Sequence, residues 1–166
     1  MSKLLIISTQ ANAREALSPA CLELENKTIA EGGVVERLFL NRHSISYCSA
    51  CMICKDNGIC FQNRDFDAVL KRMAEADIVA FDTAVETVTD AYGRSSYSED
   101  LTLKRLLFPE LTWFPDRRIK LLQDLSAEVR GEMKLFCTGD EGMDLEEAAA
   151  AVKAHIIKAF PNIKCA

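Results

Sequence analysis

RDFDAVLKRMAEADIVAFDT, residues 64–83, joins a helix pattern directly to a strand pattern. Its first half carries apolar residues at the i, i+3, i+4, i+7, i+8 spacing of one helix face, namely Phe66, Val69, Leu70, Met73 and Ala74. Asp65 stands where a helix N-cap is expected. Residues 77–83 follow directly and read as a strand that is apolar on both faces. A helix leading straight into a buried strand predicts an α/β fold with a parallel sheet.

The same alternation of strands and helices extends over the rest of the chain. The pattern predicts strands at residues 3–8, 34–40 and 133–138, and an edge-strand stub at 163–166. It predicts a helix that begins at Ser18-Pro19, carries Cys21, Leu22, Ile29 and Ala30, and stops at Gly32-Gly33. A second helix begins with a capping box of Asp144 and Glu147 and runs through Phe160. Residues 84–100 are polar and are expected to form a long loop.

Composition limits the classes of function. The 166 residues, 49% hydrophobic and 27% charged, fit one globular domain. The formal net charge of −5, without basic clusters, argues against nucleic-acid binding. No apolar run approaches the roughly 20 residues of a membrane span, and the apolar start is too short for a signal peptide, so a cytoplasmic location is expected.

Cysteine placement is the unusual feature. Four of the seven cysteines, Cys48, Cys51, Cys54 and Cys60, follow the pattern C-x2-C-x2-C-x5-C. Three cysteines at this interval let one turn of backbone reach three corners of an iron–sulfur cubane, and Asn57-Gly58 supplies a turn that returns Cys60 to the fourth. The spacing therefore favours a [4Fe-4S] cluster. Cys21, Cys137 and Cys165 are expected to be small buried hydrophobic residues.

Two other interpretations of the four cysteines remain open. A structural zinc site uses thiolates too, although it usually draws them from two separated pairs. Four thiols without a metal are the other alternative. A haem attachment site is excluded because neither C-x-x-C pair is followed by histidine.

The cysteine spacing at 48–60, followed by Arg64-Asp65-Phe66-Asp67 and by Ala76 to Phe81, resembles the iron–sulfur flavoproteins within the flavodoxin-like NAD(P)H-dependent FMN reductases. The resemblance implies a flavodoxin-like three-layer sandwich with a central parallel sheet of four to five strands. It implies one domain over 1–166, with a cysteine-rich metal loop at 47–61 inserted between strand two and helix two. This chain resembles a divergent member that is short at its C-terminal end.

The resemblance also implies FMN at the carboxyl ends of the strands. The implied flavin-binding residues follow the first, third and fourth strands: Ser8, Thr9, Asn12, Arg14, Thr83, Ala84, Val85, Thr138, Gly139 and Asp140. The loop after the fourth strand matches the family pattern. The first loop lacks the family's glycine, and after the third strand Asp82 replaces a glycine and Glu86 an aromatic residue.

Two functions follow from these features. The first is an electron-transfer iron–sulfur flavoprotein that relays electrons between a reduced donor and a protein or small-molecule acceptor. Such a protein is expected to be a homodimer or homotetramer, or a subunit of a larger redox complex. The second is a flavin-less binding or assembly subunit whose cysteine loop holds zinc or a cluster for structure. Neither hypothesis assigns a catalytic residue.

Overall fold

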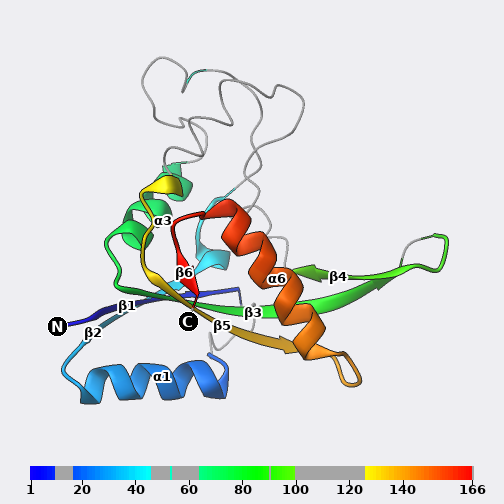
Figure 1. The fold of residues 1–166 in the computed structure, drawn as a ribbon, viewed down its shortest axis with the longest axis horizontal. Helices are drawn as coiled ribbons and strands as arrows, with labels where there is room; N and C mark the ends of the chain where they lie inside the picture. The colour runs from blue at the N-terminus through cyan, green and yellow to red at the C-terminus, as the bar shows by residue number, and fades with distance from the viewer. Residues whose placement is uncertain (10–16, 46–52, 54–63, 90, 100–125, 166) are drawn as a thin grey trace.

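The computed structural model describes residues 1–9, 17–45, 53, 64–89, 91–99 and 126–165 (Figure 1). Its strands are β1 (Lys3–Ser8), β2 (Val34–Phe39), β3 (Ile78–Thr89), β4 (Ser95–Glu99), β5 (Glu132–Gly139) and β6 (Lys164–Cys165). Its helices are α1 (Pro19–Ala30), the 3-10 turn η1 (Leu40–Arg42), α3 (Arg64–Ala74) and α6 (Leu145–Ala159).

The central sheet has the strand order β2-β1-β3-β5-β6, and every neighbouring pair on this path is parallel. Helix α1 covers one face, and α3 and α6 cover the other (Figure 1). This arrangement confirms the three-layer α/β sandwich, the parallel sheet and the expected stub of edge strand.

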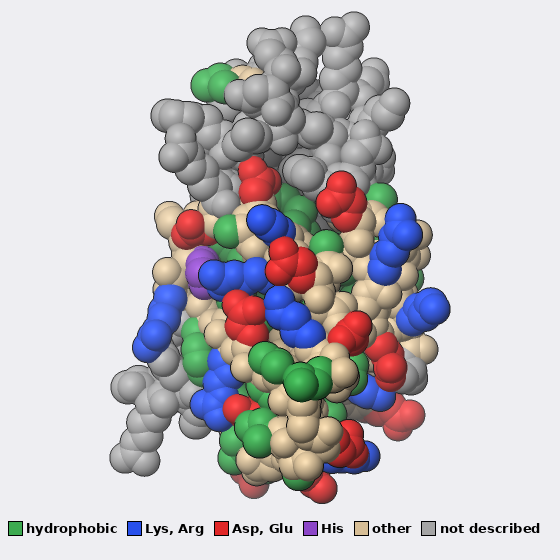
Figure 2. Space-filling view, turned by 90° about the vertical axis from the view of Figure 1, so that its left-hand side faces the viewer, with side chains coloured by type: hydrophobic (Ala, Val, Ile, Leu, Met, Phe, Trp, Pro, Cys, Tyr) green, Lys and Arg blue, Asp and Glu red, His purple; other side chains and the backbone are tan. Residues whose placement is uncertain are grey.

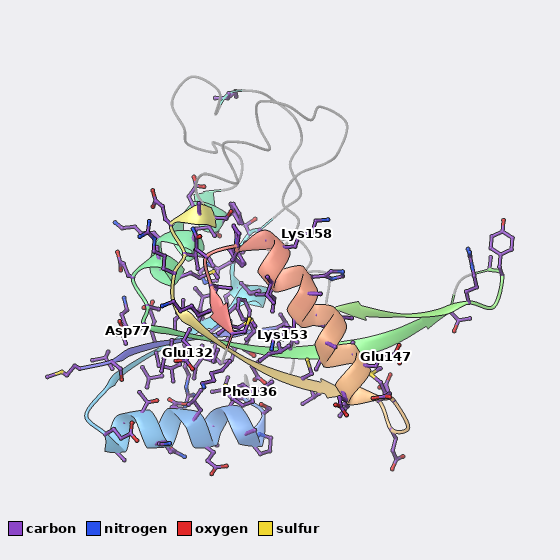
Figure 3. The ribbon with its side chains drawn as sticks, viewed as in Figure 1. Asp77, Glu132, Phe136, Glu147, Lys153 and Lys158 are labelled. Atoms are coloured by element: carbon purple, nitrogen blue, oxygen red, sulfur yellow. The ribbon has the colours of Figure 1, made fainter. Side chains whose placement is uncertain are left out.

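The two faces of the sheet bury different side chains because alternate residues of a strand point to opposite faces. The larger core lies between the sheet and helices α3 and α6 and includes Ile7, Phe81 and Ile156. A smaller core faces α1 and contains Leu4, Ile6, Cys21 and Ala80. Phe136 of β5 points toward α1 and packs against this second cluster (Figure 3).

The inner face of α1 is more polar than its sequence suggests. Cys21, Glu25 and Thr28 are its buried residues. Glu25 accepts hydrogen bonds from Arg37 of β2, at 2.6 Å from Nη2 and 3.0 Å from Nε. Leu22 and Ile29, which belong to the same helix, are instead 41% and 56% exposed. The paired Glu25 carboxylate takes an inner position that the hydrophobic pattern does not reveal.

Two of the three predicted helix caps are confirmed. Ser18 Oγ accepts from the Cys21 backbone N–H, and Asp144 Oδ1 accepts from the backbone N–H groups of Glu146 and Glu147. Asp65, by contrast, is not the cap but lies in the first turn of α3, which begins at Arg64.

The expected long loop at 84–100 was also wrong. Strand β3 continues through Thr89, and β4 returns antiparallel to it, with Val85 opposite Glu99 and Thr89 opposite Ser95. Four of the six residues 84–89 are valine or threonine, and such β-branched residues suit strands even where the sequence is polar. Gly93, at φ 76°, provides the left-handed conformation that the turn between the strands needs. Figure 1 shows β3 and β4 running together past the end of β5.

The three scattered cysteines do not share one environment. Cys21 is buried as expected, whereas Cys137 is half-buried and Cys165 is exposed. Cys165 is exposed because it belongs to the two-residue edge strand β6, which has no second neighbour on the described path of the sheet.

Surface charge agrees with the composition. Figure 2 shows basic and acidic side chains interspersed over the face drawn there. Lys3 Nζ lies 3.3 Å from Glu75 and 3.8 Å from Glu36, and Arg72 Nε lies 3.3 Å from Glu36. Over the described ranges, no helix has the length and apolar character that crossing a bilayer requires.

Candidate functional site: the strand ends and the root of the cysteine segment

The strand order reverses direction between β1 and β3, since the chain passes from β1 outward to β2 and then back to β3 on the other side. Parallel α/β sheets bind ligands beyond the carboxyl ends of the strands at such a switch point. Here β1 ends at Ser8, which lies opposite Asp82 of β3 and Phe39 of β2. The candidate site therefore lies at the carboxyl ends of these strands, just beyond the three residues.

Thr9 joins strands β1 and β3 at their carboxyl ends. Its backbone N–H donates to the Asp82 carbonyl at 3.0 Å. Its hydroxyl donates to Thr83 Oγ1 at 3.3 Å and accepts from the Ala84 N–H at 3.3 Å. The structure thus brings together Ser8, Thr9, Thr83 and Ala84, four of the predicted flavin-binding residues. Both threonine side chains are buried, and their hydroxyl groups already bond within the protein.

Residues 83–85 lie inside strand β3 rather than in a loop. Thr83, Ala84 and Val85 pair with residues 137–139 of β5, and Val85 also pairs with Glu99 of β4. Strand β3 can pair with one neighbour on each side. Because β5 occupies one side, β4 must pair with β3 on the side of β1, beyond the end of β1 at Ser8. Thr9 and the end of β4 therefore stand directly beyond β1, at the switch point itself.

The end of β5 is closely packed. A Cβ on Gly139 would stand 2.6 Å from Met143 Sδ and 3.2 Å from the Val85 carbonyl, so a larger residue there would require the Met143 side chain to shift. The Asp140 carbonyl accepts from the Met143 N–H at 3.2 Å, which closes the turn into α6. Thr138 is half-buried, whereas Gly139 and Asp140 are exposed and lie at the same sheet edge as Thr83 and Ala84.

Asp82 is a site residue that sequence reasoning did not select. Its side chain is 0% exposed and lies on the α1 face of the sheet, beneath the start of that helix. Oδ2 accepts from the Ser18 backbone N–H at 3.0 Å, while Oδ1 has no hydrogen-bond partner in the described part of the chain. The available signal was an acidic residue inside an apolar strand, at a position where the family has glycine.

The pKa of the Cys21 thiol is affected by the same buried surroundings as Asp82. Burial raises the pKa of its thiol from 9.0 to about 12, and the negative charges of Asp82 and Glu25 add to the rise. A pKa that is higher in the folded state stabilises the fold below the unfolded-state pKa, and this stabilisation is lost as pH rises through the folded-state value.

We therefore expect the free energy of unfolding to fall between pH 9.0 and about pH 12, and a Cys21→Ala variant to lose that part of the fall. At neutral pH the buried thiol should resist iodoacetamide while exposed Cys165 reacts. Peptide mass spectrometry after brief alkylation of the native protein checks the second point. Equal labelling of both cysteines would contradict the assigned burial.

The two ends of the cysteine segment are held together. Ile45 and Phe66 are each 2% exposed and belong to the larger core. Between them, Asp65 Oδ2 accepts from the Ser44 N–H at 2.6 Å and lies 4.0 Å from His43 Nδ1. Asp65, in the first turn of α3, therefore joins the two ends of the cysteine segment, which we call its root, through its bond to Ser44.

Several predicted site residues lie outside the described part of the chain. These are Asn12, Arg14 and the four proposed metal ligands Cys48, Cys51, Cys54 and Cys60. Within the described residues, no three His, Cys, Asp or Glu side chains gather in a way that could hold a metal ion. The predicted metal centre therefore rests on the four-cysteine donor set, whose thiolates suit an iron–sulfur cluster.

Comparison with known proteins locates the chain more closely. No family model matches it. It is 35% identical over 68 residues to an iron-sulfur flavoprotein of Archaeoglobus fulgidus, a match that covers 41% of this chain and 29% of that protein. Over these 68 residues the chain is similar to an iron–sulfur flavoprotein. The match spans less than a third of that relative's own length.

Solved structures agree with the fold. An azoreductase from Bacillus anthracis superposes with a TM-score of 0.57 at 18% identity, covering 99% of this chain and 85% of that one. RosB, solved with bound 8-demethyl-8-formylriboflavin-5'-phosphate, gives a TM-score of 0.60 at 14% identity, covering 99% and 62%. These likenesses confirm the flavodoxin-like architecture.

The described residues fit a flavin phosphate poorly. Among the donors near the start of α1, the Ser18 N–H is bound to Asp82 and the Cys21 N–H to Ser18 Oγ, while Pro19 has no N–H. The carboxylate of Asp82 stands where a phosphate would seek positive charge. An FMN phosphate bound at this helix terminus would therefore meet a buried anion.

Proposed function

We propose that this protein is an electron carrier of the iron–sulfur flavoprotein type, with a [4Fe-4S] cluster held by Cys48, Cys51, Cys54 and Cys60 and a flavin at the strand ends. The cysteine spacing and the relation to an iron-sulfur flavoprotein support the cluster. When bound, the cluster supplies one-electron transfer, and a flavin can exchange one or two electrons.

One structural observation carries this proposal. The cysteine segment leaves the sheet just after β2, whose last residue Phe39 lies opposite Ser8 of β1. The two ends of the cysteine segment, joined by the bond between Ser44 and Asp65, therefore lie at the same end of the sheet as the candidate ligand site. A cluster in this segment and a ligand at the strand ends would share one edge of the molecule.

The partners follow from this chemistry. We propose a reduced donor on one side and a protein or small-molecule acceptor on the other, in a cytoplasmic protein. The chain would act as a homo-oligomer or as a subunit of a larger redox complex, with its single domain presenting the cysteine-rich loop at 47–61. The acidic net charge of −5 suits neither nucleic acid nor another polyanion as partner.

The testing experiment is a visible absorption spectrum of protein purified without oxygen, with iron, sulfide, zinc and flavin assayed on the same sample. About four iron and four sulfide per chain, together with a flavin, would support the two-centre carrier. Zinc alone, or no metal, would contradict the electron-carrier function.

A second candidate function has a specific observation in its favour. Thr9 and β4 occupy the switch point, and Asp82 opposes a phosphate, so a flavin-less subunit with a structural zinc or cluster is also compatible with the strand ends. Metal without flavin would favour this subunit, and a redox titration of the metal would then decide whether it carries electrons.

The closed root of the cysteine segment gives a further prediction. We expect Asp65→Ala to release iron to a chelator several-fold faster, because the Ser44 N–H loses its acceptor and the two ends of the segment separate more easily. The loss in folding free energy should be only about 1 kcal/mol.

The control for this variant is Asp77→Ala, which removes an acceptor of the Lys3 N–H at the opposite end of the sheet. Iron release is followed anaerobically with a coloured chelator. Equal release rates in the two variants would show that closure at Asp65 does not protect the metal.

A further inference from the structure

The bond to Ser18 accounts for only one of the two carboxylate oxygens of Asp82. Asp82 is 0% exposed, it lies at the last β1 pairing position, opposite Ser8, and it reaches the first residue before α1. A buried carboxylate usually has partners for both oxygens, because an unmet acceptor in a low dielectric is costly. Within the described residues only Oδ2 has one.

The charge of Asp82 acts on its surroundings. Burial raises the pKa of Cys21, on the first turn of α1, and the nearby negative charge of Asp82 adds to this rise. The helix terminus would otherwise attract an anion, but the fixed carboxylate already complements it. A phosphate placed there would meet like charge in a region shielded from water, where repulsion is stronger than in solvent.

The orphan oxygen points to a different ligand chemistry. Oδ1 can only accept a hydrogen bond, so it suits a hydroxyl or amide N–H and not a phosphate oxygen. The hydroxyl groups of Thr9 and Thr83, on the other face of the sheet, already bond to each other. Asp82 Oδ1 is therefore a buried acceptor beneath the start of α1, next to the switch point, that the described protein leaves unsatisfied.

We propose that Asp82 selects the flavin by charge, so that this site takes riboflavin, which carries hydroxyl groups but no phosphate, in preference to FMN. This inference rests on the proposed flavin function and names the ligand of that site. Asp82 is a specificity-determining residue in this proposal, and it takes no part in electron transfer.

The decisive variant is Asp82→Asn. The amide oxygen can still accept from the Ser18 N–H, and the amide NH2 replaces the orphan acceptor with a donor, so the fold is retained while the charge is removed. Asp77→Asn is the matched control, because Asp77 directly precedes the first residue of β3 and so lies at the opposite end of the sheet from Asp82 (Figure 3).

The measurement is the dissociation constant of riboflavin and of FMN for the full chain, purified without oxygen, by quenching of flavin fluorescence. For the wild type we expect riboflavin to bind about tenfold or more tightly than FMN. Asp82→Asn should lower the ratio of the FMN constant to the riboflavin constant by about the same factor. Asp77→Asn should leave the ratio unchanged.

Each outcome decides the proposal. Wild-type protein that binds FMN as tightly as riboflavin overturns the selectivity while leaving the flavoprotein function intact. An unchanged ratio in Asp82→Asn overturns the assignment to Asp82. Binding of neither flavin overturns both the inference and the flavin part of the proposed function, whereas the iron and sulfide assay still tests the cluster. If the variant does not fold, the two-ligand comparison on the wild type still tests the selectivity.

Discussion

Cys54→Ser is expected to abolish stoichiometric iron and sulfide and the visible absorption of the cluster. Cys54 is the third cysteine of the C-x2-C-x2-C run, and a serine hydroxyl is a much poorer ligand for iron than a thiolate. If the cluster serves electron transfer, the variant should keep its fold while redox activity falls to background. Iron, sulfide and the absorption spectrum, measured together with far-ultraviolet circular dichroism, check this result.

Cys165→Ser is the matched control because it changes the same atom in an exposed cysteine of β6. It should leave iron content and spectrum unchanged. Loss of the fold together with the metal in Cys54→Ser would instead indicate a structural site and favour the second function. Full retention of iron and sulfide in Cys54→Ser would remove this residue from the proposed ligand set.

Phe81→Ala is expected to have the largest effect on stability. Phe81 is 0% exposed in β3, the central strand of the sheet, between Ile7 of β1 and Leu135 of β5, and packs in the core beneath α3 and α6. Truncating a buried phenylalanine costs about 3–5 kcal/mol, because apolar contacts are lost and a cavity remains. That is a large part of the roughly 5–15 kcal/mol that stabilises an ordinary domain.

Denaturant unfolding followed by circular dichroism measures this loss, which should lower the melting temperature by about 10 °C or more. Ile157→Ala is the control, because Ile157 lies on α6 with its side chain 39% exposed and alanine favours helices. The control should change stability by less than about 0.5 kcal/mol. Similar losses in both variants would contradict the placement of Phe81 in the core.

Elements with strong local patterns were predicted well. The apolar run of β1, the cap at Ser18 and the capping box at Asp144 depend on residues a few positions apart, so the sequence shows them directly. The helix face of Phe66, Val69, Leu70 and Met73 is buried as its spacing indicates.

Elements that depend on a distant partner were missed. The strand pairing of residues 85–89 with 95–99 was read as a loop because its residues are polar, although hydrogen bonds with a neighbouring strand satisfy their backbone groups. Asp65 was assigned to a cap from its place just before the apolar helix face. Its bond to Ser44 could not be foreseen, because it joins residues on either side of the cysteine segment. Cys165 was expected to be buried because its type usually is, but it belongs to an edge strand.

The α/β class, the parallel sheet and a four-cysteine donor set with iron–sulfur spacing could be predicted from the amino-acid sequence, since each depends on the type and interval of neighbouring residues. The groups that lie at the strand ends could be identified only from the folded structure. Thr9 meets Thr83, and Asp82 meets Ser18, across 74 and 64 positions of sequence. Such contacts arise from the folding of the whole sheet, and they set the charge and the hydrogen-bonding groups that a ligand would meet there.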